Sequence, residues 1–282
     1  MLVVVEHDFV AIGEVMLDIV LPALQLDEVV HAPISVRAGG VPVNAAVAAA
    51  TRLGARAAVV GRVGSDAAAA AIRDELGRNG VDARFATDVE RSTGTFVRSG
   101  RTIVADRGAG RFLDEDDIPP SLATRAVLVS GHTLLNEETA AAGRAAIARS
   151  TAAFVGVVTA SARLAASAGW PRFRELTDGA TVLFANADEA RALTGRAPAE
   201  AAALLAASYP IAFVTDAERG AHVAWDRHVV HRASDVVAST TVGAGDAFAG
   251  VALHSLAGGD SPDAALGRAV EAGASWARGT TA

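Results

Sequence analysis

The sequence predicts an α/β protein: a mostly parallel β-sheet with helices on both faces and a small β-sheet lid. Short apolar runs, many of them β-branched, alternate with helical patterns along most of the chain. This alternation is typical of a parallel, helix-covered sheet. The runs are apolar throughout, as expected for strands buried on both faces. With 282 residues and 51% hydrophobic content, the chain can build a large core, and we expect one domain over residues 1–282.

The expected elements follow from periodicity and from capping residues. Strands are expected at Phe9–Ile12, Ala57–Val60, Ala126–Ser130, Ala153–Val157, Thr181–Ala185 and Ile211–Thr215. Helices are expected at Val41–Leu53, Asp66–Asn79, Glu137–Ser150, Asp188–Leu193, Ala199–Ala207, Asp246–Leu256 and Pro262–Arg278. Ser65 is the expected N-cap of the second helix and Gly80 its C-cap.

Two segments interrupt the alternation and predict the lid. Residues 14–40 hold short strand-like pieces without a helix, and residues 93–106 have the pattern of a hairpin that turns at Ser99-Gly100. We expect both segments to cover one end of the sheet. Because an open β edge invites pairing with another chain, we also expect a homodimer through the lid. The acidic run Asp114–Asp117 is expected to be a solvated loop.

Composition excludes several classes of function. Lysine is absent, since all 25 basic residues are arginine, so a lysine-containing P-loop, a protein-kinase-like site and Schiff-base chemistry are excluded. Cysteine is absent too, which excludes disulfides and thiolate chemistry. The net charge of -7 argues against nucleic acid as a partner. No apolar run reaches the ~18 residues of a membrane span, and no basic secretory start is present, so we expect a cytoplasmic protein without membrane contact.

The run Thr240 to Gly250 carries the strongest chemical signal. Gly243, Ala244 and Gly245 lead into Asp246, and apolar residues at helical spacing follow. A glycine-rich turn that opens a helix binds anions through unpaired N–H groups and the helix dipole. A carboxylate at that point suits phosphoryl transfer, where it accepts the proton of the attacking hydroxyl. The structural alternative is a simple helix N-cap.

A second motif lies about 200 residues earlier. Gly39 and Gly40 allow the backbone to approach a ligand closely, Pro42 suits a first helical turn, and Asn44 presents an amide from that turn. Taken alone, this motif is a helix start.

Together and in this order, the two motifs resemble the signatures of the ribokinase-like carbohydrate kinases, the PfkB family. Weaker matches span nearly the whole chain: Gly13 to Asp18, Arg62 to Asp66, Thr93 to Thr95, Arg107 to Ala109, Asn186 to Ala190 and Val214 to Gly220. The resemblance implies the ribokinase-like fold and a kinase that transfers the γ-phosphoryl group of ATP to a hydroxyl of a small sugar or sugar acid.

The resemblance also implies a role for each matching residue. Asp246 would be the catalytic base, and the amides of Gly243, Ala244 and Gly245 would stabilise charge on the transferring group. Asp18, Gly39, Gly40, Asn44 and Arg107 would hold the substrate; for Arg107, a surface role is the alternative. Asn186, Thr215 and Gly220 would border the nucleotide, and Glu189 would act on Mg²⁺, through water.

Some positions depart from the family pattern. Thr240 stands where relatives carry an aspartate that helps to bind a monovalent cation, and the C-terminal loop for that ion looks truncated, so the sequence argues against potassium activation. Ala217 stands where the turn after Thr215 usually carries a glycine, and the strand ending Val157-Val158-Thr159-Ala160 lacks the aspartate that many members have there.

Other functions stay open at this point. A nucleoside kinase on the same fold is one; an aromatic content of 5% favours a sugar over a stacked base. A non-catalytic sugar or nucleotide sensor is another, which intact Asp246, Asn186 and Glu189 oppose. A dinucleotide-binding protein is disfavoured because Phe248 and Leu113 occupy the third-glycine positions of the two G-x-G runs, and no G-x-S-x-G of a serine hydrolase is present. His132 suits a structural role better than a place in the substrate cleft.

Overall fold

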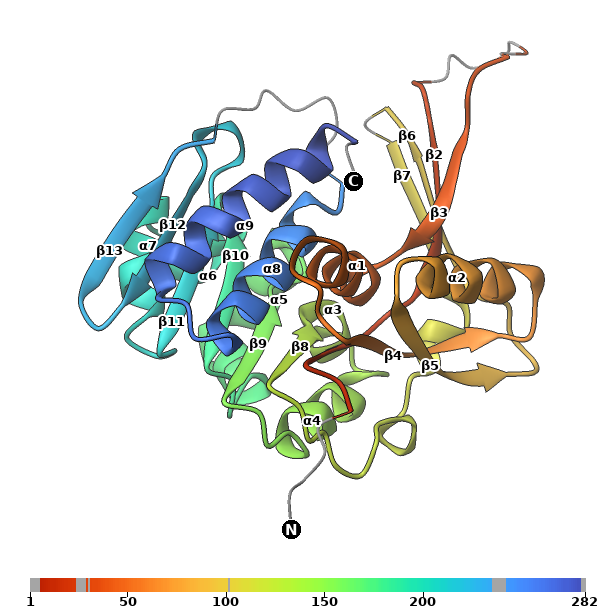
Figure 1. The fold of residues 1–282 in the computed structure, drawn as a ribbon, viewed down its shortest axis with the longest axis horizontal. Helices are drawn as coiled ribbons and strands as arrows, with labels where there is room; N and C mark the ends of the chain where they lie inside the picture. Colours follow the sequence, from red (N-terminus) through yellow and green to blue (C-terminus); the bar gives the residue numbers. More distant parts are fainter. Residues whose placement is uncertain (1–5, 24–28, 30, 101, 235–241, 280–282) are drawn as a thin grey trace.

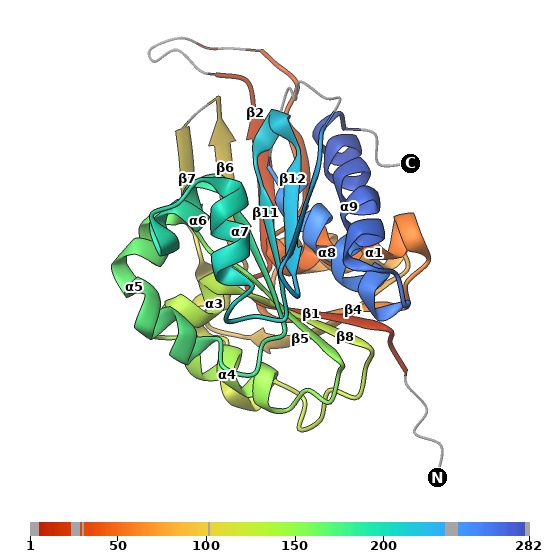
Figure 2. The same ribbon diagram turned by 90° about the vertical axis from the view of Figure 1, so that its left-hand side faces the viewer.

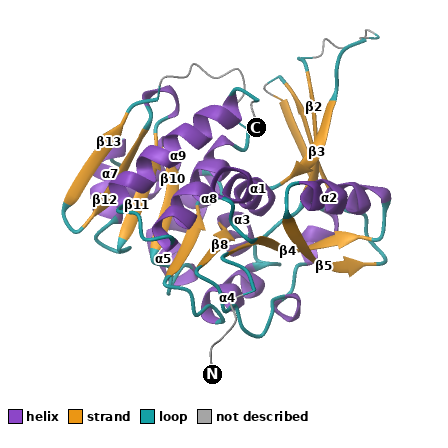
Figure 3. Ribbon diagram, in the orientation of Figure 1, coloured by secondary structure: helices purple, strands orange, loops and turns teal. Residues whose placement is uncertain are grey.

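A computed structural model describes residues 6–23, 29, 31–100, 102–234 and 242–279. The described residues contain two β-sheets: a large one in the body of the protein and a small one that projects from the body (Figures 1 and 3). The large sheet has the order β13-β12-β11-β10-β9-β8-β1-β4-β5. Its strands are β1 (Phe9–Ile12), β4 (Ala57–Gly64), β5 (Val81–Asp88), β8 (Ala126–Ser130), β9 (Phe154–Val158), β10 (Val182–Asn186), β11 (Ile211–Thr215), β12 (Ala221–Trp225) and β13 (His228–Arg232).

Helices cover both faces of the large sheet (Figure 2). The helices on one face are α1 (Val41–Leu53), α2 (Ala67–Arg78), α8 (Ala244–Ala257) and α9 (Pro262–Ala277). Those on the other are α3 (Gly131–Leu135), α4 (Ala140–Ala148), α5 (Ala162–Leu176), α6 (Ala187–Thr194) and α7 (Pro198–Leu205). Short 3₁₀ helices occur at η1 (Gly108–Phe112), η2 (Glu115–Asp117) and η3 (Ala217–Arg219).

Strand β1 explains why the apolar runs do not alternate with polar residues. Phe9 and Ala11 pack into the core on the α1 face, whereas Val10 and Ile12 pack into the core on the opposite face. Successive strand side chains point to opposite faces, so a strand between two helical layers must be apolar at every position. The predicted α/β class with a parallel sheet is confirmed; β12 and β13 add an antiparallel edge.

The small sheet is the predicted lid. It consists of β2 (Met16–Leu21), β3 (Ser35–Gly39), β6 (Gly94–Ser99) and β7 (Thr102–Asp106), in the order β3-β2-β6-β7. Asp66 ties its base to the body: its carboxylate accepts hydrogen bonds from Thr93 N at 2.7 Å and from Ala69 N at 2.9 Å. One side chain therefore caps α2 and holds the start of β6, so the expected Ser65 cap is wrong by one position.

The acidic run Asp114–Asp117 is not simply a solvated loop. It contains η2, and the Asp117 carboxylate accepts from Arg62 Nε at 2.8 Å on the body of the protein. Among the helices within the described part of the chain, none has the length and apolar character of a membrane span.

Candidate active site

The glycine run opens α8 and leaves its first amides unpaired. The first bond of the helix runs from Ala247 N to Gly243 O at 2.9 Å, so the N–H groups just before Ala247 have no intrahelical acceptor. Gly243 must be glycine for two reasons. Its φ is 81°, and a Cβ there would lie 2.7 Å from Trp276 Nε1 and 2.9 Å from Asn44 Nδ2. The start of α8 therefore has the unpaired amides of the predicted anion site, and packing fixes the backbone at Gly243.

Asp246 and Asn44 bring the two sequence motifs together. Asn44 Nδ2 donates to Asp246 Oδ2 at 2.9 Å across a separation of 202 residues. The asparagine comes from the first turn of α1, which Gly40 opens with a φ of 100° and without room for a side chain, because a Cβ would lie 2.2 Å from Glu14 O. Burial raises the pKa of Asp246, opposed by the Asn44 hydrogen bond and by the charges of His132 and Arg37. Such a carboxylate is an improved proton acceptor.

Asp18 reaches the same region from lid strand β2. Its side chain is buried, and Gly39 makes room for it, since a Cβ at that position would lie 2.1 Å from Asp18 Cγ. Burial raises the pKa of Asp18 to about 6, with Arg37 opposing the rise and Asp246 and Glu75 adding to it. Substrate candidates from β2, β3 and α1 are thus brought together beside Asp246.

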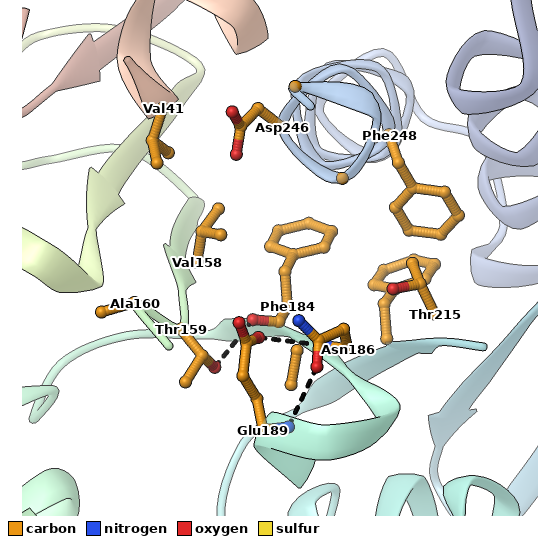
Figure 4. Close-up of a pocket in the computed structure, with 14 residues that line it drawn as sticks. Val41, Val158, Thr159, Ala160, Phe184, Asn186, Glu189, Thr215, Asp246 and Phe248 are labelled. Carbon is orange, nitrogen blue, oxygen red and sulfur yellow. Dashed lines mark hydrogen bonds between the residues drawn. The ribbon is translucent and has the colours of Figure 1, made fainter. Parts of the chain in front are cut away.

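A cavity of about 210 Å³ lies between the start of α8 and the carboxyl ends of β10 and β11. Figure 4 shows Asp246 on one side of it and Asn186 and Glu189 on the other. Thr215, in register with Asn186, also lines it. The remaining lining residues are Val41, Val158, Thr159, Ala160, Phe184, Ala185, Phe213, Gly243, Gly245 and Phe248. The cavity joins the predicted base, the predicted anion-binding turn and three predicted nucleotide or metal residues.

Asn186 and Glu189 form a capping box at the start of α6. Asn186 Oδ1 accepts from Glu189 N at 3.0 Å, and Glu189 Oε2 accepts from Asn186 N at 2.9 Å. Burial raises the pKa of Glu189 to about 7, and the charges of Asp246 and Asp188 add to the rise while the Asn186 hydrogen bonds oppose it. The charge of Asp246 thus raises the pKa of Glu189 across the cavity, and a divalent cation in the cavity would offset that repulsion.

The described residues contain no group of three or more His, Asp or Glu side chains that could ligate a metal by themselves. This donor set fits Mg²⁺ held mainly through water and substrate phosphates, with Glu189 and Asn186 as outer partners.

Two predicted residues lie elsewhere. Gly220 does not line the cavity; it closes the η3 turn with a φ of 97°, where a Cβ would lie 1.9 Å from Arg232 O. Arg107 Nε donates to Glu14 Oε1 at 2.7 Å, and its Nη1 lies 3.6 Å from Glu138 Oε2. Arg107 is therefore paired with buried Glu14 and connects the end of the lid to the body of the protein. A direct contact between Arg107 and the substrate stays a prediction. Thr240 lies outside the described residues.

Sequence reasoning missed Arg37, Trp276 and Thr159. Trp276 on α9 donates through Nε1 to Val242 O at 3.1 Å, and Arg37 from the lid donates to the same oxygen at 3.4 Å. Nothing in the local pattern pairs residues so distant in the chain. Thr159, noted only for the missing aspartate, lines the cavity and donates to Phe184 O at 2.9 Å.

Comparison with known proteins assigns the class. The model of the pfkB family carbohydrate kinases matches residues 6–280, so the chain belongs to the PfkB family. No curated protein matches it significantly. The chain is a phosphotransferase with the fold of the sugar and nucleoside kinases.

Solved structures agree in fold. Adenosine kinase from Sinorhizobium meliloti is 20% identical with a TM-score of 0.82, over 95% of this chain and 93% of that one. A ribokinase from Thermotoga maritima is 20% identical with a TM-score of 0.79, over 96% and 93%. An E. coli protein provisionally named ribokinase II, solved with ATP and Mg²⁺, is 19% identical with a TM-score of 0.83, over 95% and 91%.

Proposed function

We propose that this protein is an ATP-dependent sugar kinase that transfers the γ-phosphoryl group of ATP to a hydroxyl of a small sugar or sugar acid. The observation that carries the proposal is the Asn44–Asp246 hydrogen bond at 2.9 Å beside the glycine-opened start of α8. It places a carboxylate of raised pKa next to unpaired amides. Proton acceptor and anion site therefore adjoin the same cavity, as phosphoryl transfer requires.

The proposed roles are those that the family resemblance implies, and this geometry supports them. Asp246 accepts the proton of the acceptor hydroxyl while the amides of Gly243, Ala244 and Gly245 stabilise charge on the transferring phosphoryl group. Bound Mg²⁺, held through water by Glu189 and Asn186, would neutralise charge on the nucleotide phosphates. Asp18 accepts hydrogen bonds from hydroxyls of the sugar, and Asn44 donates a hydrogen bond to one of them. Gly39 and Gly40 let the sugar approach the backbone closely. The lid above them excludes water, which would otherwise compete as phosphoryl acceptor.

A nucleoside acceptor is the second candidate because of one lid residue. Phe96 on β6 is the register partner of Asp18, so the two side chains lie on the same face of the lid. An aromatic ring beside the acceptor could stack on a base.

The test is ADP release from MgATP across pentoses, hexoses, keto-deoxy sugar acids and nucleosides, with and without potassium. We expect release with one acceptor class, independent of potassium. Silence across the panel, from a folded protein that binds ATP, would contradict the kinase and favour a sensor.

We propose further that the lid forms a homodimer. On the face opposite Asp18, a row of β-branched side chains crosses all four lid strands through the register pairs of Val36, Ile19, Val97 and Val104. Val36 is 56% exposed and Val104 64% exposed. A β-branched row beside the open edge of β7 suits a self-complementary contact with a second copy of this chain.

Val104→Asp is expected to convert the dimer to a monomer, because it puts a desolvated charge into that contact. Light scattering coupled to size exclusion measures the mass. Leu204→Asp, on α7 and 51% exposed, is the matched control and should stay dimeric. A wild-type chain that elutes only at the monomer mass would refute the dimer.

A further inference from the structure

Arg37 connects the lid to the body of the protein. It lies on β3 as the register partner of Asp18 on β2. Its Nη2 donates to Val242 O at 3.4 Å across a separation of 205 residues. Its guanidinium lies over the ring of Trp276, with Cζ 5.8 Å from the centroid. Trp276 in turn donates to the same Val242 oxygen at 3.1 Å. The Val242 carbonyl is therefore held by one donor from the lid and one from α9.

Val242 directly precedes the anion-binding turn. Gly243, the next residue, packs so tightly between Trp276 and Asn44 that a Cβ there would lie within 2.9 Å of both. A shift of the Val242 carbonyl would therefore move the amides that follow it. Because electrostatic stabilisation depends on donors fixed before the reaction, the contacts of Arg37 and Trp276 bear directly on the anion site.

Arg37 also faces the acidic groups of the acceptor region. Its Nε lies 4.0 Å from Asp18 Oδ2, and it is buried without an acceptor among the described residues. A hydrogen bond of ~2.9 Å would need about 1 Å of approach. The charge of Arg37 lowers the pKa of both Asp18 and Asp246 against the effect of burial.

Other groups face the same two carboxylates. They are Asn44 and His132 toward Asp246, Glu75 toward Asp18, Glu189 toward Asp246, and the two carboxylates toward each other. Arg37 is the charged group that acts on both carboxylates and also contacts the residue before the anion site.

We propose that Arg37 is a positioning residue that couples the acceptor-binding carboxylate of the lid to the anion-binding turn, so that an acceptor seated against Asp18 tightens the backbone at Val242. This inference rests on the roles of Asp18 and Asp246 in the proposed function. Arginine suits the role because its planar fork can serve a carboxylate and a carbonyl at the same time.

Arg37→Met is the test, with Arg73→Met as the matched control. Arg73 makes the same kinds of contact far from the site: Nη1 donates to Ala83 O at 3.3 Å, and its guanidinium lies 4.8 Å from the Phe85 ring centroid. The first measurement is amide hydrogen exchange at Ala247, whose N–H is the first of α8 with an intrahelical acceptor, Gly243 O at 2.9 Å, and this measurement needs no activity. In Arg37→Met we expect this exchange to rise about tenfold, since a charge-assisted hydrogen bond is lost.

The second measurement is the pH profile of kcat/KM. Removing a cation raises the pKa of the carboxylates it faces, so the acidic limb should move upward by roughly one pH unit in Arg37→Met. Arg37→Lys keeps the positive charge, so the acidic limb of its pH profile should match that of wild type. Its amide exchange should stay fast, because lysine lacks the planar fork of arginine. Arg73→Met should match wild type in both.

Wild-type exchange at Ala247 in Arg37→Met would overturn the coupling, whether or not the enzyme is active. An unmoved acidic limb would overturn the electrostatic part. If no acceptor supports ADP release, or if Asp246→Asn stays fully active, the proposed function fails instead, and the exchange measurement still decides the contact between lid and turn.

Discussion

Asp246→Asn should lower kcat by about 10²- to 10⁴-fold, the usual contribution of a positioned general base. That loss corresponds to roughly 3–5 kcal/mol of barrier. The folded structure should persist, because an asparagine oxygen can still accept the bond from Asn44 Nδ2, now 2.9 Å from the carboxylate. The apparent KM for ATP should change little, since the substitution leaves the amides of the turn in place. Steady-state ADP release and a thermal melt measure both effects.

Asp260→Asn provides the control for this substitution. Asp260 follows α8 and accepts from Arg268 Nε at 2.9 Å on the surface, so the same chemical change there should leave kcat unaltered. An Asp246→Asn enzyme that keeps more than about a tenth of the wild-type rate would exclude Asp246 as the base, because one pKa-matched proton acceptor contributes at least about 10²-fold.

The fold was predictable where one physical rule decided the outcome. Burial on both faces made β1 apolar throughout, and made β8 and β11 apolar up to their last residues, Ser130 and Thr215; the expected bounds of all three strands agree with the structure. Strand β5 escaped notice because it lies at the sheet edge and mixes exposed and buried positions. Helix α5 escaped notice because Gly169, with a φ of 69°, and Pro171 interrupt the helical pattern.

The site was predictable only in part for a similar reason. Local chemistry marked Asp246 and Asn44, since a glycine turn and an amide on a first helical turn are visible in sequence, whereas Glu189 was expected only from the resemblance of Asn186 to Ala190 to the family. Their convergence on one cavity depends on strand order. Arg37 and Trp276 have no local signature, because their significance comes from a shared carbonyl at Val242. Ala217 shows that a departure from the family sequence need not change the backbone. It stands where the sequence analysis expects a glycine, yet the turn keeps a positive φ of 48° at this residue.

Glu189→Gln should stabilise the ligand-free protein at neutral and alkaline pH. Burial raises the pKa of Glu189 from its ordinary value of 4.5 to about 7. Because the pKa of Glu189 is higher in the folded than in the unfolded wild-type protein, protonated Glu189 favours the folded state. This contribution to the free energy of unfolding is fully present below pH ~4.5 and is lost as the pH rises through the folded-state pKa. Above pH ~7 the wild type carries the full cost of a buried negative charge, about 3 kcal/mol at 1.36 kcal/mol per unit. Glutamine does not titrate, so the variant avoids this cost.

The measurement is the unfolding free energy of both proteins in urea from pH 4.5 to 8.5. The difference in favour of Glu189→Gln should grow from pH 4.5 to 7 and then stay level. Glu175→Gln is the control: Arg172 lowers the pKa of that exposed carboxylate, so its difference should be small and of opposite sign. A flat difference for Glu189→Gln would show that its carboxylate is not desolvated.

Adding MgATP should reverse the ranking, because a divalent cation in the cavity compensates the charge of Glu189 and leaves glutamine without that partner. Wild type should then gain more stability from MgATP than Glu189→Gln does, whereas ATP with a chelator should stabilise both alike. Equal gains from MgATP would exclude Glu189 as a magnesium partner. The cost that Glu189 imposes on the empty protein would thus be recovered when the nucleotide and its cation bind, as expected of a carboxylate retained for function.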